Sequence, residues 1–183
     1  CLKHRTLLTA SCGGCGLRFR LRRYSPLRPS TDLACGNQLG LRQHCPHSVL
    51  EGESQPAPAE VLSMQLSIDA ALAGAPTEFM GQMVVPQVYL AELRNTATLL
   101  LHLLTRPGGR KRVHWGSDLH AEASARTTEL RGPRWGVSPP ASSLIRAGAL
   151  SEAWEIVTQS SLDEAAAKLS PWLDLISDIP NGP

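Results

Sequence analysis

The chain has 183 residues, of which 42% are hydrophobic, with only two Phe, two Tyr and four Trp. This length fits one domain or two small ones, with a core built mainly from Leu, Ala, Val and Ile. No run of about 18 apolar residues occurs, which excludes a membrane-spanning helix. No charged segment followed by an apolar one opens the chain, so we expect no secretory signal. Because the chain begins with Cys1 instead of Met, we interpret it as a fragment or a trimmed chain.

The net charge of +2 hides a split between the two parts of the chain. Residues 1–50 contain eight basic residues and one acid, Asp32, for a net charge of +7. Residues 51–183 contain ten basic and fifteen acidic residues, for a net charge of −5. Such an asymmetry indicates contact with a nucleic acid or another polyanion, confined to the N-terminal part.

Cysteine and histidine residues at short spacings mark the first 50 residues, which contain all five cysteines. The candidate metal ligands, in chain order, are Cys1, His4, Cys12, Cys15, Cys35, Cys45 and His47. Zinc favours tetrahedral sets of Cys and His that are supplied as close pairs separated by longer loops. Gly16, directly after Cys15, suits the tight turn that aims a pair of ligands at one ion. The sequence therefore predicts a zinc-binding module.

Two assignments of ligands to one zinc ion are open. Cys1, His4, Cys12 and Cys15 can close a site, although its loop of seven residues is short. Alternatively, Cys12 and Cys15 pair with Cys35 and Cys45, and His47 or His44 acts as a substitute. We favour the second arrangement because its longer loop resembles zinc-ribbon spacing. Cys1 and His4 would then be half of a finger whose cysteine pair lies upstream.

Three other interpretations of the cysteines are weaker. Disulfides would leave one of five cysteines unpaired, in a chain without an export signal. A redox Cys-Gly-Gly-Cys would need a surrounding βαβ pattern, which is not found. A zinc deaminase needs His-x-Glu followed by Pro-Cys-x-x-Cys. His120 and Glu122 supply the first half, but no cysteine follows them.

A basic segment lies between Cys15 and Cys35. Apolar and basic residues alternate over residues 17–24, as in a half-buried strand with its arginines facing outward. Guanidinium groups at this spacing can form bidentate bonds with phosphate oxygens. The alternative is a strand face that is only solvated, and we favour nucleic acid because no acid lies nearby. The candidate DNA-binding residues are Arg18, Arg20, Arg22, Arg23 and Arg28.

Beyond a polar, Pro-rich linker at residues 51–59, the sequence predicts helices alone. Apolar residues at helical spacing predict helices over 61–72, ended by Gly74, and over 86–104, ended by 107–109. Residues 106–140 give no clear pattern. A helix is predicted over 141–158, and a capping box of Ser161 and Glu164 opens a last helix to about Ile176, which Pro171 can break.

The predicted fold class is thus mainly α. A small zinc-ribbon-like β module (1–50) and the linker (51–59) precede an all-α helical domain (60–183). No phosphate-binding loop or nucleophile elbow occurs, so we expect no enzymatic activity. Asp118, His120 and Glu122 are the remaining candidates for catalysis, and polar residues on a helix face explain them more simply.

At this point the residues suggest a family. The run from Cys1-Leu-Lys-His4 through Leu7-Leu8 to Cys12-Gly-Gly-Cys15-Gly resembles the zinc-finger end of the TniQ domain of bacterial transposition proteins. The resemblance covers about residues 1–75. Its further matches, which look like the actinobacterial branch of the family, are Cys35, Cys45, Pro56-Ala-Pro, Gln65, Ile68-Asp69, Leu72 and, beyond residue 75, Ser138-Pro-Pro and Ala147-Gly-Ala-Leu150.

The resemblance implies a non-enzymatic, zinc-containing adaptor that helps to choose the insertion site of a transposon. Such proteins bind target DNA or a DNA-bound guide complex, contact an AAA+ ATPase and other transposition proteins, and act at the bacterial nucleoid in the cytoplasm rather than at a membrane. The chain departs from the family pattern in two ways. The N-terminal helix-turn-helix and the upstream cysteine pair are missing, and Asp32 stands where a cysteine is expected.

Overall fold

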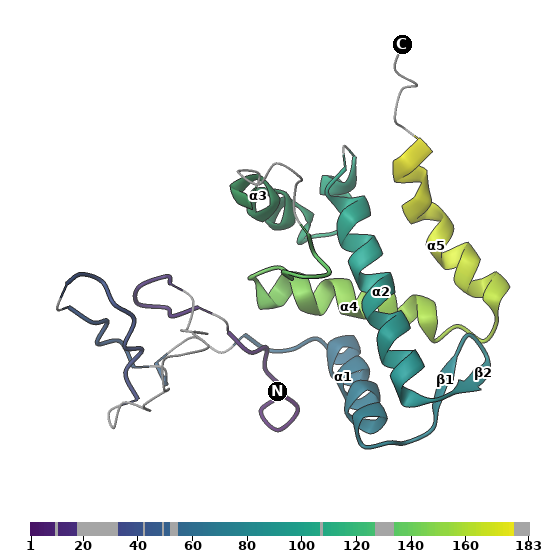
Figure 1. Ribbon diagram of the computed structural model, residues 1–183, viewed down its shortest axis with the longest axis horizontal. Coiled ribbons are helices and arrows are strands. Elements are labelled where there is room, and N and C mark those ends of the chain that lie inside the picture. The colour runs from purple at the N-terminus through teal and green to yellow at the C-terminus, as the bar shows by residue number, and fades with distance from the viewer. Residues whose placement is uncertain are drawn as a thin grey trace, which may run out of the picture. The chain divides into compact units, whose positions relative to one another are not determined.

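The computed structural model describes residues 1–9, 11–17, 33–41, 43–48, 50–51, 55–106, 108–126 and 134–177. Internal contacts divide the chain between Pro56 and Ala57, within the predicted linker, into an N-terminal unit and a helical unit. The elements (Figure 1) are α1 (Ala59–Leu72), β1 (Thr77–Phe79), β2 (Gln82–Val84), α2 (Pro86–Leu104), the 3-10 helix η1 (Gly109–Lys111), α3 (Gly116–Arg126), α4 (Ser143–Val157) and α5 (Leu162–Ser177). The prediction of a mainly α fold is confirmed. None of the helices in these ranges is both long and apolar enough for a membrane span.

The ends of α1 and α2 follow from their sequences. Gly74 has a φ of 84° and donates its backbone N–H to the carbonyl of Ala71 at 3.0 Å, while Ala75 donates to Ala70 at 2.9 Å. This pair of bonds is the Schellman motif, which requires a left-handed residue that glycine supplies without strain. Pro86 is the first residue of α2, where its missing N–H and fixed φ cost nothing. The predicted stop and start are therefore confirmed.

The expectation that the helical unit is all-α is wrong at one place. Strands β1 and β2 form an antiparallel hairpin in which Phe79 pairs with Gln82 across a two-residue turn. Met80 and Gly81 in this turn both have positive φ values, 48° and 77°, as in a type I′ turn. Gly81 also has no room for a side chain, because an added Cβ would lie 2.1 Å from the carbonyl oxygen of Ser160. The hairpin is thus fitted against the turn that precedes α5.

The C-terminal half contains one helix that the sequence does not predict and two that it does. Helix α3 lies in the segment without a clear pattern and buries only Gly116 and Leu119. Helices α4 and α5 are confirmed, and the Ser161 hydroxyl accepts a hydrogen bond from the Glu164 N–H at 3.2 Å, as the capping box predicts. Pro171, which can break a helix, does not break α5, which runs through it to residue 177.

The core of the helical unit is centred on α2 and α4, which cross each other in Figure 1 and make the most extensive contact between elements. Leu100 and Leu104 of α2 are completely buried, and Trp115 before α3 is 1% exposed. Gly148 of α4 makes room for this indole, because a Cβ at that position would lie 2.1 Å from Trp115 Nε1. The core therefore has one large aromatic residue seated on a glycine of α4.

Candidate metal centre

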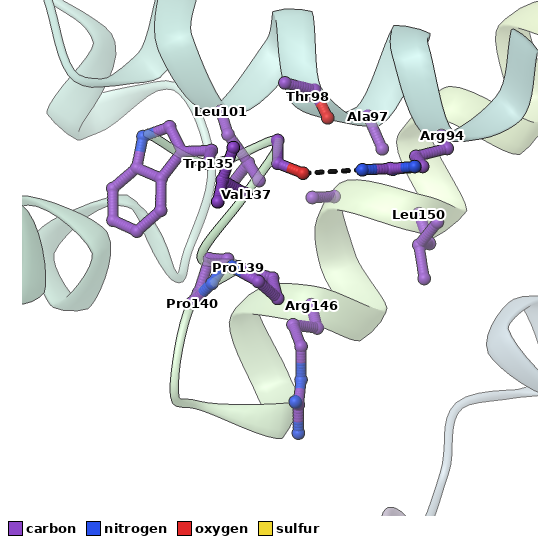
Figure 2. Close-up of a pocket in the computed structure, with 12 residues that line it drawn as sticks. Arg94, Ala97, Thr98, Leu101, Trp135, Val137, Pro139, Pro140, Arg146 and Leu150 are labelled. Carbon is purple, nitrogen blue, oxygen red and sulfur yellow. Dashed lines mark hydrogen bonds between the residues drawn. The ribbon is translucent and has the colours of Figure 1, made fainter. Parts of the chain in front are cut away.

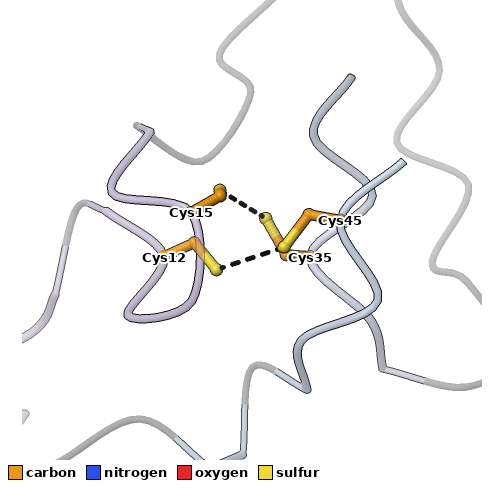
Figure 3. Close-up of side chains that lie close together, drawn as sticks. All are labelled: Cys12, Cys15, Cys35 and Cys45. Carbon is orange, nitrogen blue, oxygen red and sulfur yellow. Dashed lines mark hydrogen bonds between the residues drawn. The ribbon is translucent and has the colours of Figure 1, made fainter. Parts of the chain in front are cut away.

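The first ligand pair lies in a tight turn over residues 12–17. Gly16 donates its N–H to the carbonyl of Cys12 at 2.9 Å, and Cys12 donates its own N–H to the carbonyl of Leu17 at 2.9 Å. Gly16 has a φ of 68°, a conformation that a residue with a side chain adopts only with strain. The chain therefore reverses within five residues, and the side chains of Cys12 and Cys15 lie next to each other (Figure 3).

The second ligand pair comes from a hairpin-like loop, although nine residues separate Cys35 from Cys45. Isolated antiparallel bridges join Ala34 to Ser48 and Gln38 to His44. Between these bridges, the backbone N–H of Cys35 donates to the His47 carbonyl at 2.8 Å, and the backbone N–H of Cys45 donates to the Asn37 carbonyl at 2.8 Å. Backbone pairing thus brings two cysteines that are distant in sequence side by side. In the first pair, the short spacing of Cys12 and Cys15 within one turn has the same effect.

Four sulfur atoms gather where these two loops meet. The Sγ atoms of Cys12, Cys15, Cys35 and Cys45 all lie within 4.8 Å of one another. The distances from Cys12 to Cys45 and from Cys15 to Cys35 are both 3.9 Å (Figure 3). A tetrahedral zinc ion with bonds of about 2.3 Å holds its sulfurs about 3.8 Å apart, so the observed spacing fits one ion. All five cysteines are free, and these separations are far beyond the length of a disulfide bond.

The environment of the thiols differs from one cysteine to the next. The Asn37 side-chain amide donates to Cys15 Sγ at 3.6 Å and lowers the pKa of this thiol to about 7. Burial raises the pKa of the Cys35 thiol to about 12. At Cys45 the backbone N–H of His47 lowers the pKa, but burial and the nearby sulfurs outweigh it and the net direction is upward. Of these three thiols, Cys15 therefore loses its proton most readily, and a bound cation must displace the protons of Cys35 and Cys45.

The donor set indicates what a metal ion would do in this site. Four cysteines complete a tetrahedral coordination shell and leave no position for water or substrate, as in structural zinc sites. Cys12 and Cys45 are 2% and 4% exposed, so the centre is closed on the side of these two sulfurs. The geometry thus supports a metal that links two loops rather than one that performs catalysis.

The other predicted ligands are not in this cluster. Cys1 and His4 form a separate pair, with 3.3 Å between Sγ and Nδ1. His47 packs on the first turn, because a Cβ added to Gly14 would lie 2.6 Å from the Cβ of His47. The Nδ1 of His47 is 3.8 Å from a carboxylate oxygen of Glu51. The expectation that His47 or His44 substitutes for a cysteine is therefore not needed. Of the two arrangements, the structure brings together the one in which Cys12 and Cys15 pair with Cys35 and Cys45.

Asn37 is a residue of the site that the sequence analysis missed. It is 3% exposed, and its amide also donates to the carbonyl of Leu17 at 3.3 Å. Asn37 therefore joins the second loop to the first and fixes the orientation of Cys15 at the same time. The available signal was its position two residues after Cys35.

The predicted DNA-binding arginines, Arg18, Arg20, Arg22, Arg23 and Arg28, lie outside the described residues, as does Asp32. Their contact with DNA stays a prediction. The three polar residues considered for catalysis all lie in α3. Asp118 is exposed in the first turn, His120 Nε2 lies 2.6 Å from the Leu104 carbonyl at the end of α2, and Glu122 accepts the backbone N–H of Ala141.

No protein family, curated protein or solved structure that was compared with the chain matches it.

Proposed function

We propose that this chain is a DNA-binding adaptor of the TniQ type, which acts in the choice of a transposon insertion site, and that zinc at Cys12, Cys15, Cys35 and Cys45 is a structural part of it. The observation that carries the proposal is the gathering of these four sulfurs. Because Cys15 and Cys35 lie 3.9 Å apart, residues 16–34 form a loop whose two ends meet at the metal centre. That loop contains all five candidate DNA-binding arginines.

A closed loop has a physical advantage for binding a polyanion. The metal joins its ends, so part of the chain entropy that binding would otherwise cost is already lost in the folded protein. The loop also carries five arginines and a single acid, Asp32, and the remainder of residues 1–50 adds no further acid. Its positive field attracts phosphates and accelerates association with DNA. Zinc is the metal proposed because a closed set of four cysteines is its usual structural site.

The DNA proposal is tested by titrating the zinc-loaded chain with duplex DNA at several salt concentrations. Each phosphate neutralised contributes a slope of about 0.9 to the salt dependence, so changing Arg18, Arg20 and Arg22 to alanine is expected to lower the slope by about 2.7. The matched control changes Arg106, Arg110 and Lys111, three exposed basic residues of the helical unit, to alanine. Equal losses in both triple variants would show that net charge, and not the loop, is responsible.

A second function has its own supporting observation. In the described loop between Cys35 and Cys45, Leu41 is 99% exposed and Leu39 is 49% exposed. Exposed apolar residues that lie close together suit contact with another protein. The alternative is therefore a module in which zinc is structural and a partner protein, such as the AAA+ ATPase expected from the resemblance, is bound without DNA. Recovery of that ATPase in a pull-down, lost on Leu41→Ser, together with no affinity for DNA would favour this alternative.

A further inference from the structure

The helical unit contains a pocket that the proposed function does not use. It lies between α2, α4 and the segment 135–140, and its volume is about 300 Å³ (Figure 2). Trp135, Leu101, Pro140 and Ala149 supply an apolar lining, and its charged members are Arg94 and Arg146. Among the residues that the structure describes, no carboxylate lines the pocket, although the helical unit as a whole is acidic.

The wall formed by the segment 134–142 is held in place by α3. Arg126 donates hydrogen bonds to the carbonyls of Ser138 at 2.7 Å and Pro139 at 3.0 Å, and its guanidinium lies 4.8 Å from the centre of the Trp135 ring. Glu122 forms an ion pair with Arg126 and accepts the backbone N–H of Ala141. The pocket is therefore formed before any ligand arrives, so binding does not have to order this segment.

One guanidinium group lies within the pocket itself. Figure 2 shows Arg94 reaching from α2 across the pocket, where it donates a hydrogen bond to the Gly136 carbonyl at 2.6 Å. Arg146 extends from α4 at the edge, away from Arg94. A guanidinium has five N–H donors, so Arg94 retains donors for a carboxylate after this one bond. An apolar cavity beside a cation fits a ligand with an apolar group next to a negative charge.

We propose that this pocket binds a short acidic segment of a partner protein, with one large apolar side chain inserted between α2 and α4 and a neighbouring carboxylate on Arg94. The volume is at the lower limit for pockets that enclose small molecules, about 300–1,000 Å³, and it suits a single anchoring side chain. Val137 at the rim is 83% exposed and extends the apolar surface outside the cavity, where the rest of a peptide would lie. The site is independent of the metal centre and of DNA binding.

The probe is a fluorescein-labelled peptide with the sequence Gly-Ser-Glu-Glu-Leu-Trp-Glu-Glu-Ser-Gly, titrated with the full chain and followed by fluorescence anisotropy. Two further peptides separate the contributions. Replacing Leu-Trp by Ala-Ala is expected to weaken binding about tenfold or more, because it removes the buried anchor. Replacing the four Glu by Gln is expected to weaken it about tenfold, because the charged hydrogen bonds to Arg94 are lost.

The Ala-Ala peptide is also the control for non-specific attraction to the basic N-terminal unit. That peptide keeps every negative charge, so unchanged affinity for it would assign the binding to the arginines of residues 1–50 and overturn the proposal. Tighter binding of indole-3-acetate than of the peptide would also overturn it, in favour of a small aromatic acid.

Two protein variants test the pocket from its own side. Ala97→Leu adds three carbons in the pocket and is expected to weaken the Leu-Trp peptide about tenfold. Val137→Asp changes an exposed rim residue, so the protein still folds while the apolar contact is lost and a repelling charge is gained. Its matched control, Leu162→Asp, makes the same change at a position that is 67% exposed and outside the pocket. Equal affinities of these two aspartate variants would contradict the proposed site.

Discussion

The N-terminal unit and the helical unit of this protein are each stabilised by a different kind of interaction. In the helical unit, α2 and α4 enclose a continuous set of buried side chains that includes Leu100, Leu104 and Trp115. Among the described residues before Pro56, only two hydrophobic side chains are buried, Cys12 and Cys45, and both belong to the sulfur cluster. The leucines described there, such as Leu8 and Leu41, are 68% and 99% exposed. One unit is thus stabilised by apolar burial, whereas the other depends on its sulfurs.

This difference has a physical basis in size. A unit of about 50 residues buries too small a fraction of its surface for a sufficient hydrophobic core, and small domains commonly use metals instead. A bound ion that joins two loops gives the folded state a free energy that does not depend on apolar area. It also leaves apolar and basic side chains available at the surface, which suits a unit whose proposed role is contact with DNA.

The largest effect is expected from removing the metal. Chelation, or the double change Cys12→Ser and Cys45→Ser, should unfold residues 1–50, because structural zinc supplies on the order of 10 kcal/mol to so small a unit. The helical circular dichroism should persist, since the helices lie in the other unit. Two-dimensional NMR spectra before and after chelation measure both units at once.

Cys1→Ser is the matched control for the cysteine changes, because Cys1 lies outside the four-sulfur cluster. It should leave metal content and the spectrum unchanged. Loss of the helical signal on chelation would contradict the separate stabilisation of the two units, since it would mean that they fold as one.

The second largest effect is expected when the core of the helical unit, instead of the metal site, is changed. Trp115→Ala should destabilise the helical unit by about 3–5 kcal/mol, the cost of removing a buried aromatic side chain. Zinc release, measured with a chromophoric chelator, should be unchanged, because the sulfur cluster contains no residue of the helical unit. Leu72→Ala is the control, since Leu72 is 70% exposed and little burial is lost there. An equal fall in melting temperature for both variants would contradict the placement of Trp115 in the core.

The same division explains what could be predicted from the sequence. Local signals were sufficient where the structure is local: Gly74 ends α1, Pro86 begins α2 and Ser161 caps α5. The pair Cys12 and Cys15 is likewise joined by a turn within its own segment. In each case the residues involved lie within about five positions of one another, and residue type alone indicates the geometry.

Structure that depends on distant contacts was missed. The hairpin at β1 and β2 turns on Met80, which has a φ of 48° where Asn or Gly is usual, and it is secured by a bond from the Met80 N–H to the carbonyl of Val157. Helix α3 has few apolar residues of its own and is fixed by contacts of His120 and Glu122 with other segments. The meeting of Cys35 and Cys45 was predicted from ligand chemistry, but the backbone pairing across nine residues that produces it was not. A periodic pattern cannot report such contacts.

A smaller effect is expected from Asn37→Ala, which tests whether the N-terminal unit depends on more than its four sulfurs. The change removes the amide that bonds Cys15 Sγ and the Leu17 carbonyl. Loss of such a supporting bond typically weakens metal binding about 10- to 100-fold. Competition with a zinc chelator of known affinity measures the change. Gln43→Ala, an exposed position in the same loop, is the control, and an equal loss there would refute a specific role for Asn37.

The smallest effect concerns the capping hydrogen bond at the start of α5. Ser161→Ala removes the hydroxyl that accepts the Glu164 N–H, which should cost about 1 kcal/mol. Ser170→Ala lies within the same helix at an exposed position, and it should be neutral or slightly stabilising because alanine has the higher helix propensity. Chemical denaturation followed at 222 nm compares the two. Opposite signs at two serines of one helix would show that the capping bond, and not serine itself, stabilises α5, whereas equal effects would remove the cap from this account.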